Sequence, residues 1–269
     1  MSWQRRPVGL TARLGDLTLF ALLAAEGGSQ GDDEFLSGGH YETSVGDFRF
    51  GGVLAALAGR HDRLVGTAGL TASWSASAFT VSGEGYLQRG DAGDYPGTAG
   101  VRAEGNALRF AAGYAGALRI QVCAVRISGD RRGDDRTEGR FLSYEDNDAT
   151  LIVEGNDYGL DIDTNYESLQ VSVGVPLDLG GTQVQPRLLV AAFRFLEAVP
   201  LAPDPPAGVG SRSRTLGTEI DASVDVAWTA QLSFTLAAAW LVGARALESF
   251  TADGDDGAWL FTVGARLRF

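Results

Sequence analysis

The chain closes on the nine residues Phe261-Thr262-Val263-Gly264-Ala265-Arg266-Leu267-Arg268-Phe269. Every second residue of this stretch is apolar, and the residues between are polar or small, with two arginines among them. This period of two is that of a β-strand with one apolar and one polar face. A soluble sheet seldom stops on an aromatic residue in mid-strand without a polar tail, so the stretch predicts the last strand of a closing barrel.

The composition excludes several classes of protein. The net charge is −12 and all 22 basic residues are arginine, which argues against a nucleic-acid binder because such proteins carry a basic patch. The one cysteine, Cys123, excludes an internal disulfide, and no Cys/His cluster has the spacing of a zinc site. No apolar run approaches the ~18–20 residues of a membrane-spanning helix, so a membrane location has to come from strands of ~9–11 residues.

Strand-like alternation recurs along the chain, and the connections between the strands are alternately short turns and long loops. Gly15-Asp16 and Gly46-Asp47 have the composition of hairpin turns, and a bulge is expected near Gly105-Asn106. The longest irregular stretch, 129–164, carries a short strand predicted over Ala149–Val153. We therefore predict an all-β, antiparallel transmembrane β-barrel of about 12 to 14 strands, with short periplasmic turns and long extracellular loops.

The strand count bears on how much of the barrel this chain contains. Alternation gives about thirteen strands, whereas a closed bacterial barrel has an even number. We expect residues 1–269 to form one β-barrel domain, either complete with one strand miscounted or the C-terminal part of a larger barrel. Leu17–Ala25 fits either a strand or the remnant of a signal peptide.

The closing stretch resembles the C-terminal signal of bacterial outer-membrane barrels, which is carried here by Thr262, Gly264, Leu267 and Phe269. This resemblance implies the bacterial outer membrane as the location. It also implies two partners, the lipid of that membrane and the barrel assembly machinery, which would bind the signal.

A second resemblance is to the alginate-export family of outer-membrane barrels. It is carried by Leu216-Gly217-Thr218-Glu219-Ile220-Asp221, by the long amphipathic strands that follow, by the terminal Arg266-Leu267-Arg268-Phe269, and by Ser128-Gly129-Asp130. Members of that family are typically wider barrels of more strands, in which an arginine-rich lumen passes an anionic polysaccharide. This chain is shorter, and the lumen it predicts mixes both signs of charge.

Charged residues on the polar side of the predicted strands are the candidates for the solute path. Guanidinium groups pair with carboxylates bidentately, so arginines there would attract a polyuronate, whereas acids among them fit salt-bridged wall residues of a general pore. Tryptophans near strand ends suit the aromatic girdles where lipid meets water. The path candidates are Arg102, Arg119, Arg187, Arg245, Arg266, Arg268, Glu104, Glu219, Asp221 and Asp225, and the girdle candidates are Trp228, Trp240, Trp259 and Phe269.

No constellation of residues points to an enzyme, and no cofactor is expected. His40 and His61 have no partner at metal-ligand spacing, and the sequence contains no Gly-x-Ser-x-Gly motif. Carboxylates of Asp130, Asp134 and Asp135 could hold Ca²⁺, but their spacing is not that of an EF-hand, so no metal site is assigned.

The function expected from the sequence is a channel for the passive passage of an anionic polysaccharide or of small polar solutes, with arginines as successive weak sites. A nonspecific porin is the alternative within the same class. Two alternatives from other classes remain, an outer-membrane hydrolase that uses His61 with a serine and a soluble β-sandwich that binds a ligand. No nucleic-acid partner is expected.

Overall fold

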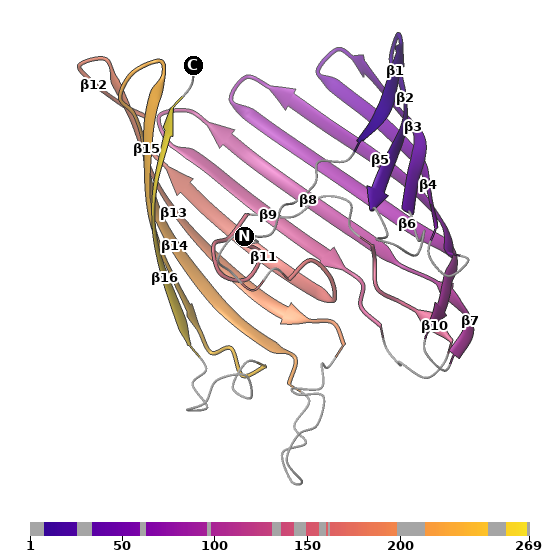
Figure 1. The fold of residues 1–269 in the computed structure, drawn as a ribbon. Coiled ribbons are helices and arrows are strands. Elements are labelled where there is room, and N and C mark those ends of the chain that lie inside the picture. The colour runs from indigo at the N-terminus through magenta and orange to yellow at the C-terminus, as the bar shows by residue number, and fades with distance from the viewer. Residues whose placement is uncertain are drawn as a thin grey trace. The chain divides into compact units, whose positions relative to one another are not determined.

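The computed structural model describes residues 8–25, 34–59, 63–95, 98–130, 136–142, 149–155, 160, 162–197, 213–246 and 257–267. These residues contain sixteen β-strands in one sheet, and no helix among them is long and apolar enough to cross a membrane (Figure 1). The strands are β1 (Val8–Leu14), β2 (Leu17–Ala25), β3 (Glu34–Val45), β4 (Phe48–Gly59), β5 (Arg63–Ala76), β6 (Phe79–Tyr95), β7 (Thr98–Ala103), β8 (Asn106–Ala115), β9 (Arg119–Ile127), β10 (Thr137–Glu138), β11 (Tyr166–Gly174), β12 (Leu177–Leu179), β13 (Thr182–Phe195), β14 (Thr215–Ala227), β15 (Leu232–Val242) and β16 (Ala258–Leu267).

The strands along the main path of the sheet agree in number with the prediction from the sequence. Thirteen strands follow one another along this path, while β7, β10 and β12 lie off it. Pairing along the chain is antiparallel, with one short exception, because β10 pairs with β7 in parallel. The expected all-β, antiparallel architecture is therefore confirmed.

The chain divides into two compact units. The first comprises the described residues of Met1–Ser75, Ser82–Leu108 and Ile127–Leu142, and the second those of Ala76–Val81, Arg109–Arg126 and Ser143–Phe269. In the first unit β1 to β6 are hydrogen-bonded in sequence order, β7 pairs with β6, and β10 pairs with β7. In the second unit the order is β11-β13-β14-β15-β16, with β12 beside β13.

Glycines make the tightest connections in the first unit. Gly15 and Gly46 each occupy the first central position of a two-residue hairpin turn, with φ of +61° and +59°, values that glycine adopts without strain. The predicted irregularity near Gly105-Asn106 is also present, because β7 ends at Ala103 and β8 begins at Asn106. At this break the Gln88 N–H donates to the Gly105 carbonyl at 2.8 Å.

Both units bury polar side chains on one face of the sheet and expose apolar side chains on the other. On β11, Ser168 and Gln170 are buried, whereas Leu169 is 55% exposed. On β5, Thr67 is buried and Leu70 is 75% exposed. This distribution is the reverse of a soluble sheet and is that of a wall with lipid outside, because large exposed apolar areas are rare on soluble monomers.

The first unit also has a small apolar core. Val65, Ala92, Val101 and Ala103 are buried together, and Leu142 packs against them. The core lies on the face of β5 opposite Leu64 and Leu70, both of which are exposed. It holds Leu142, and with it the end of the segment 136–142, which follows β9, against that face.

Candidate channel site

The polar face of the second unit is defined by the strand register. Gln170 lies opposite Ala191, which lies opposite Glu219, and Ser172 lies opposite Leu189, which lies opposite Asp221. Residues that face one another across neighbouring strands point to the same side of a sheet. We call this side the polar face; its described members include Tyr166, Ser168, Gln170, Ser172, Arg187, Glu219 and Asp221.

A segment of irregular backbone, residues 150–154, lies on this face and is held by two carboxylates of β14. The N–H groups of Ile152 and Val153 donate to the two oxygens of Glu219, at 2.6 and 2.9 Å. The Leu151 N–H donates to Asp221 Oδ2 at 3.2 Å. Such charge-assisted bonds satisfy backbone groups that have no ladder partner.

The strand predicted over Ala149–Val153 is therefore wrong. These residues form bends rather than a ladder, because their N–H groups bond to side chains of β14 instead of to a neighbouring strand. Glu219 and Asp221 are on the polar face, as predicted, but they lie beneath the segment, with 0% and 7% exposure. In the described part of the chain, Asp221 Oδ1 is buried without a hydrogen-bond partner.

Glu154 ends the segment as a third buried carboxylate. Its oxygens accept hydrogen bonds from the Tyr166 hydroxyl at 2.8 Å and from Gln170 Nε2 at 3.0 and 3.1 Å. Burial raises the pKa of Glu154 from 4.5 to about 7 and outweighs these hydrogen bonds, which lower it; the charge of Glu219 raises it further. Glu154 thus titrates near neutral pH.

Beside this cluster is a small polar cavity of about 130 Å³. Two arginines from different strands line it, Arg109 of β8 and Arg187 of β13, and both are exposed. Two guanidiniums at one cavity suit a carboxylate, which accepts paired N–H bonds from each. The remaining lining residues are Gln121, Cys123, Ala149, Gln170, Ser172 and Leu189.

The other predicted path residues of the second unit lie away from this cavity. Arg119, at the start of β9, donates to Gln185 Oε1 at 3.0 Å, and Asp225, near the end of β14, accepts from Thr235 Oγ1 at 2.6 Å. Arg266 is exposed near the end of β16. Arg245 lies in a turn beyond the end of β15 and not on a strand, because β15 ends at Val242.

The first unit contains two of the predicted path residues, Arg102 and Glu104. Arg102 is exposed, between the buried Val101 and Ala103 on β7. Glu104 forms an ion pair with Arg89 at 3.3 Å, and both side chains are exposed. Arg268, Phe269, Asp134 and Asp135 lie outside the described residues. Among the residues that are described, no group of three metal-ligating side chains could hold a metal ion.

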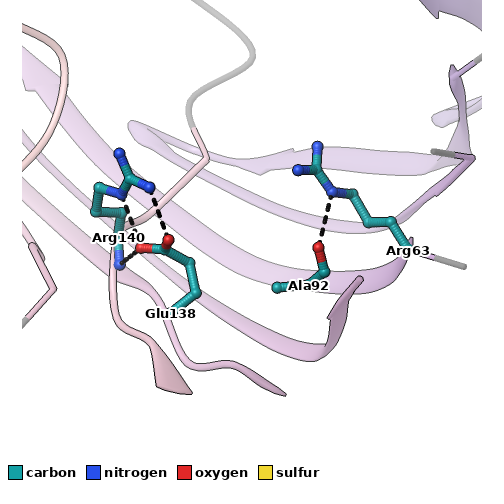
Figure 2. Close-up of polar contacts among 4 residues, drawn as sticks. All are labelled: Arg63, Ala92, Glu138 and Arg140. Atoms are coloured by element: carbon teal, nitrogen blue, oxygen red, sulfur yellow. Dashed lines mark hydrogen bonds and ion pairs between the residues drawn. The ribbon is translucent and has the colours of Figure 1, made fainter. Parts of the chain in front are cut away.

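Two other arginines of the first unit fix its own backbone and side chains (Figure 2). Arg63 donates to the Ala92 carbonyl at 3.3 Å and forms an ion pair with Glu34 at 3.0 Å. Arg140 holds the buried Glu138 bidentately, with Nε–Oε1 and Nη2–Oε2 distances of 2.8 and 2.7 Å. Both guanidiniums have carboxylate partners, Glu34 for Arg63 and Glu138 for Arg140.

The tryptophans lie near both ends of the second unit's strands. Trp240 of β15 and Trp259 of β16 are opposite each other in the register and are 57% and 81% exposed. Trp228 follows the end of β14 and is 62% exposed. Exposed indole rings at strand ends have the position of an aromatic girdle, which remains a prediction for these three residues.

Sequence reasoning missed four residues of the site, which are Arg109, Glu154, Tyr166 and Gln170. Arg109 lies between the exposed Leu108 and Phe110 on β8, so two-residue alternation places its side chain on the face opposite these apolar residues. Glu154 carried no such signal, because it lies outside any strand and meets the polar face only through tertiary contacts.

Comparisons with known proteins agree with this architecture. No protein-family model matches the chain, and no curated protein matches it in sequence. Three solved structures from Pseudomonas aeruginosa are similar in fold. The outer membrane protein OprD is 14% identical, with 96% of this chain and 67% of that chain covered and a TM-score of 0.52. OpdK with vanillate is 14% identical, with 97% and 68% covered and a TM-score of 0.55. OccK2 (OpdF) in complex with glucuronate is 14% identical, with 98% and 70% covered and a TM-score of 0.51.

At this level of identity the likeness establishes the fold. The chain has the fold of antiparallel outer-membrane β-barrels, as its closing strand predicts, and the outer-membrane location agrees with these neighbours. The likeness does not single out the alginate-export family, which the final third of the sequence resembles. A function for the chain therefore has to rest on its own side chains.

Proposed function

We propose that the chain forms a passive outer-membrane channel for small polar solutes that carry a carboxylate, with the polar faces of its strands lining the path. The observation that carries this proposal is the cavity with Arg109 and Arg187 on a polar face whose opposite side is apolar and exposed. Two exposed guanidiniums bind a carboxylate and also release it, which conduction requires. The structures with vanillate and glucuronate are channels of the same fold with carboxylates named as their ligands.

An anionic polysaccharide is the second candidate solute. Glucuronate is a uronate, and a polyuronate repeats that carboxylate along a chain. Arg119 and Arg266, exposed near the short turns, would add carboxylate sites beyond the cavity. Uronate monomers and oligomers compared on one channel separate the two candidates, because only a polymer engages several arginines at once.

The membrane setting is part of the proposal. The exposed apolar face would contact lipid, Trp228, Trp240 and Trp259 would lie at its two interfaces, and the signal that ends in Leu267 and Phe269 would be bound by the barrel assembly machinery. The chain would act as a channel and not as an enzyme. Protein that stays folded and monomeric without detergent would contradict this setting.

The experiment is current block in planar lipid bilayers. Addition of glucuronate should reduce the single-channel current in a saturable way, and Arg187→Gln should weaken this block about tenfold, the effect of losing one charge-assisted hydrogen bond. Arg194→Gln is the matched control, because Arg194 lies on the same strand, pairs with Glu167 and is exposed. If glucuronate blocks the wild type, Arg187→Gln and Arg194→Gln equally, the channel is a nonspecific pore.

A further inference from the structure

Gln170 of β11 stands between two groups of polar residues on the polar face. Tyr166 and Ser168 precede it on that face, and Ser172 follows it. Its side chain is buried, and Nε2 donates to both oxygens of Glu154, at 3.0 and 3.1 Å, and to Ser168 Oγ at 3.2 Å. The N–H groups of the Gln170 amide are therefore bonded to Glu154 and Ser168.

The carboxylate of Glu154 fixes the direction of this amide. An ionised carboxylate only accepts hydrogen bonds, so the nitrogen of Gln170 has to face it, and the carbonyl Oε1 takes the other side. Gln170 lines the cavity together with Ser172, Arg109 and Arg187, so we take its carbonyl to be presented to the cavity. The cavity thus combines guanidinium donors with one carbonyl acceptor of fixed direction.

We propose that Gln170 Oε1 accepts a hydroxyl group of the solute, which makes the cavity selective for hydroxylated carboxylates over carboxylates without hydroxyl groups. This inference rests on the proposed function, because it takes the two arginines as the carboxylate site. The selectivity arises because a carbonyl that faces a C–H group in place of a hydroxyl loses its hydrogen bond. Glu154 is a positioning residue, since it acts on the solute only through Gln170.

Protonation of Glu154 weakens this selectivity. Above its pKa of about 7 the carboxylate holds the Gln170 nitrogen; below it the amide can turn over, so that the carboxyl O–H donates to the Gln170 carbonyl, which then no longer faces the solute. The hydroxyl acceptor of the cavity is therefore present at high pH and lost as the pH falls. The charged and titratable groups packed around Glu154 and the cavity are Tyr166 of β11, Glu219 and Asp221 of β14, Arg187 of β13 and Arg109 of β8.

The test compares two probes of similar size in planar bilayers, glucuronate and cyclohexanecarboxylate, of which only the first carries ring hydroxyls. At pH about 8.5 the wild-type channel should bind glucuronate about tenfold more tightly, and Gln170→Leu should remove this preference by weakening glucuronate block alone. Gln183→Leu is the control, because Gln183 makes the same kind of amide–carboxylate contact, with Asp178 at 2.9 Å, but at the exposed start of β13.

The pH profile gives a readout that a structural role of Gln170 would not change. Between pH about 8.5 and about 6 the wild-type preference should fall, and in Glu154→Gln it should be the same at both values, because residue 154 no longer titrates. The inference would be overturned if both probes block the wild-type channel equally well, or if Gln170→Leu still prefers glucuronate. Channels that neither probe blocks would overturn the proposed function instead, so the two failures are distinguishable.

Discussion

Each unit holds a segment outside its strands, residues 139–142 in the first and 150–154 in the second, and the two segments are held by different chemistry. In the first unit Gln88 binds the backbone of Leu142 twice, with Nε2–O and Oε1–N distances of 2.9 and 2.7 Å, and its Nε2 also donates to Thr67. In the second unit the carboxylates of Glu219 and Asp221 accept three backbone N–H groups. The first contact is neutral, and the second gathers buried negative charge.

The difference shows what each kind of contact can do. An amide both donates and accepts, so Gln88 satisfies a backbone N–H and a carbonyl without any charge, and its contact is independent of pH. Carboxylates make stronger bonds to N–H groups, but crowding three of them raises the free energy of the folded state unless one is neutral. The segment at 150–154 is therefore the one that responds to protons.

Glu219→Ala should have the largest effect. It leaves the buried N–H groups of Ile152 and Val153 without their acceptor, and we expect a loss of about 3 kcal/mol of unfolding free energy. The measurement is urea unfolding in lipid vesicles, with amide exchange of residues 151–153 as the local readout. Asp225→Ala is the control, since Asp225 is an exposed acid on the same strand. Unchanged exchange at 151–153 would show that Glu219 does not hold the segment.

Gln88→Ala tests the neutral contact. The variant loses both bonds to Leu142 and the bond to Thr67, and we expect a loss of about 2 kcal/mol, because these partners are uncharged. Amide exchange should rise at residues 141 and 142 and stay constant at 151–153. Equal increases in both segments would contradict separate anchoring. Gln183→Ala, at the exposed start of β13, should leave both segments unchanged.

A pH titration separates the two contacts directly. The folded-state pKa of Glu154 is about 7 against 4.5 in the unfolded chain, so folding favours its protonated form. The stability from this group is fully present below pH 4.5 and is lost as the pH rises through about 7. From pH about 5 to about 8, exchange at 151–153, corrected for its intrinsic pH dependence, should rise about tenfold. Exchange at 141 and 142 should not change, and Glu154→Gln should abolish the rise.

Asp221→Asn should have the smallest effect, and it should be stabilising. The substitution replaces a buried carboxyl group beside Glu219 with a neutral amide, which can donate a hydrogen bond where Oδ1 has no partner in the described structure. We expect a gain of about 1 kcal/mol in unfolding free energy. Asp225→Asn, at an exposed site, should change stability by less than about 0.5 kcal/mol. A loss of stability in Asp221→Asn would mean that the charge itself holds Leu151.

The sequence predicts the strands of this molecule better than its site. Alternation identifies the closing strand, the Gly15 and Gly46 turns and the break at Gly105, because each depends on neighbouring residues. The same alternation places Glu219 on the polar face, but it carries no information about what covers that face. The segment at 150–154 covers it through contacts between residues more than sixty positions apart in the chain, and local patterns do not report such contacts.

Arg245 shows a related limit. Alternation extends past Val242 in the sequence, but Gly243 adopts φ of +69° and the chain turns there, so Arg245 leaves the strand. Arg109 and Gln170, which share the cavity, come from strands far apart in sequence, and only the pairing order brings them together. Strand register, rather than strand propensity, therefore determines the composition of the site.

The wall of the cavity includes Cys123, which is the one cysteine of the chain and is 6% exposed. A small thiol-specific reagent that reaches the cavity has a single cysteine target among these 269 residues. A solute held between Arg109 and Arg187 would shield that target, so the rate of thiol modification measures occupancy without any electrical recording. The channel thus carries its own reporter group, and neither a new cysteine nor the removal of an old one is needed to use it.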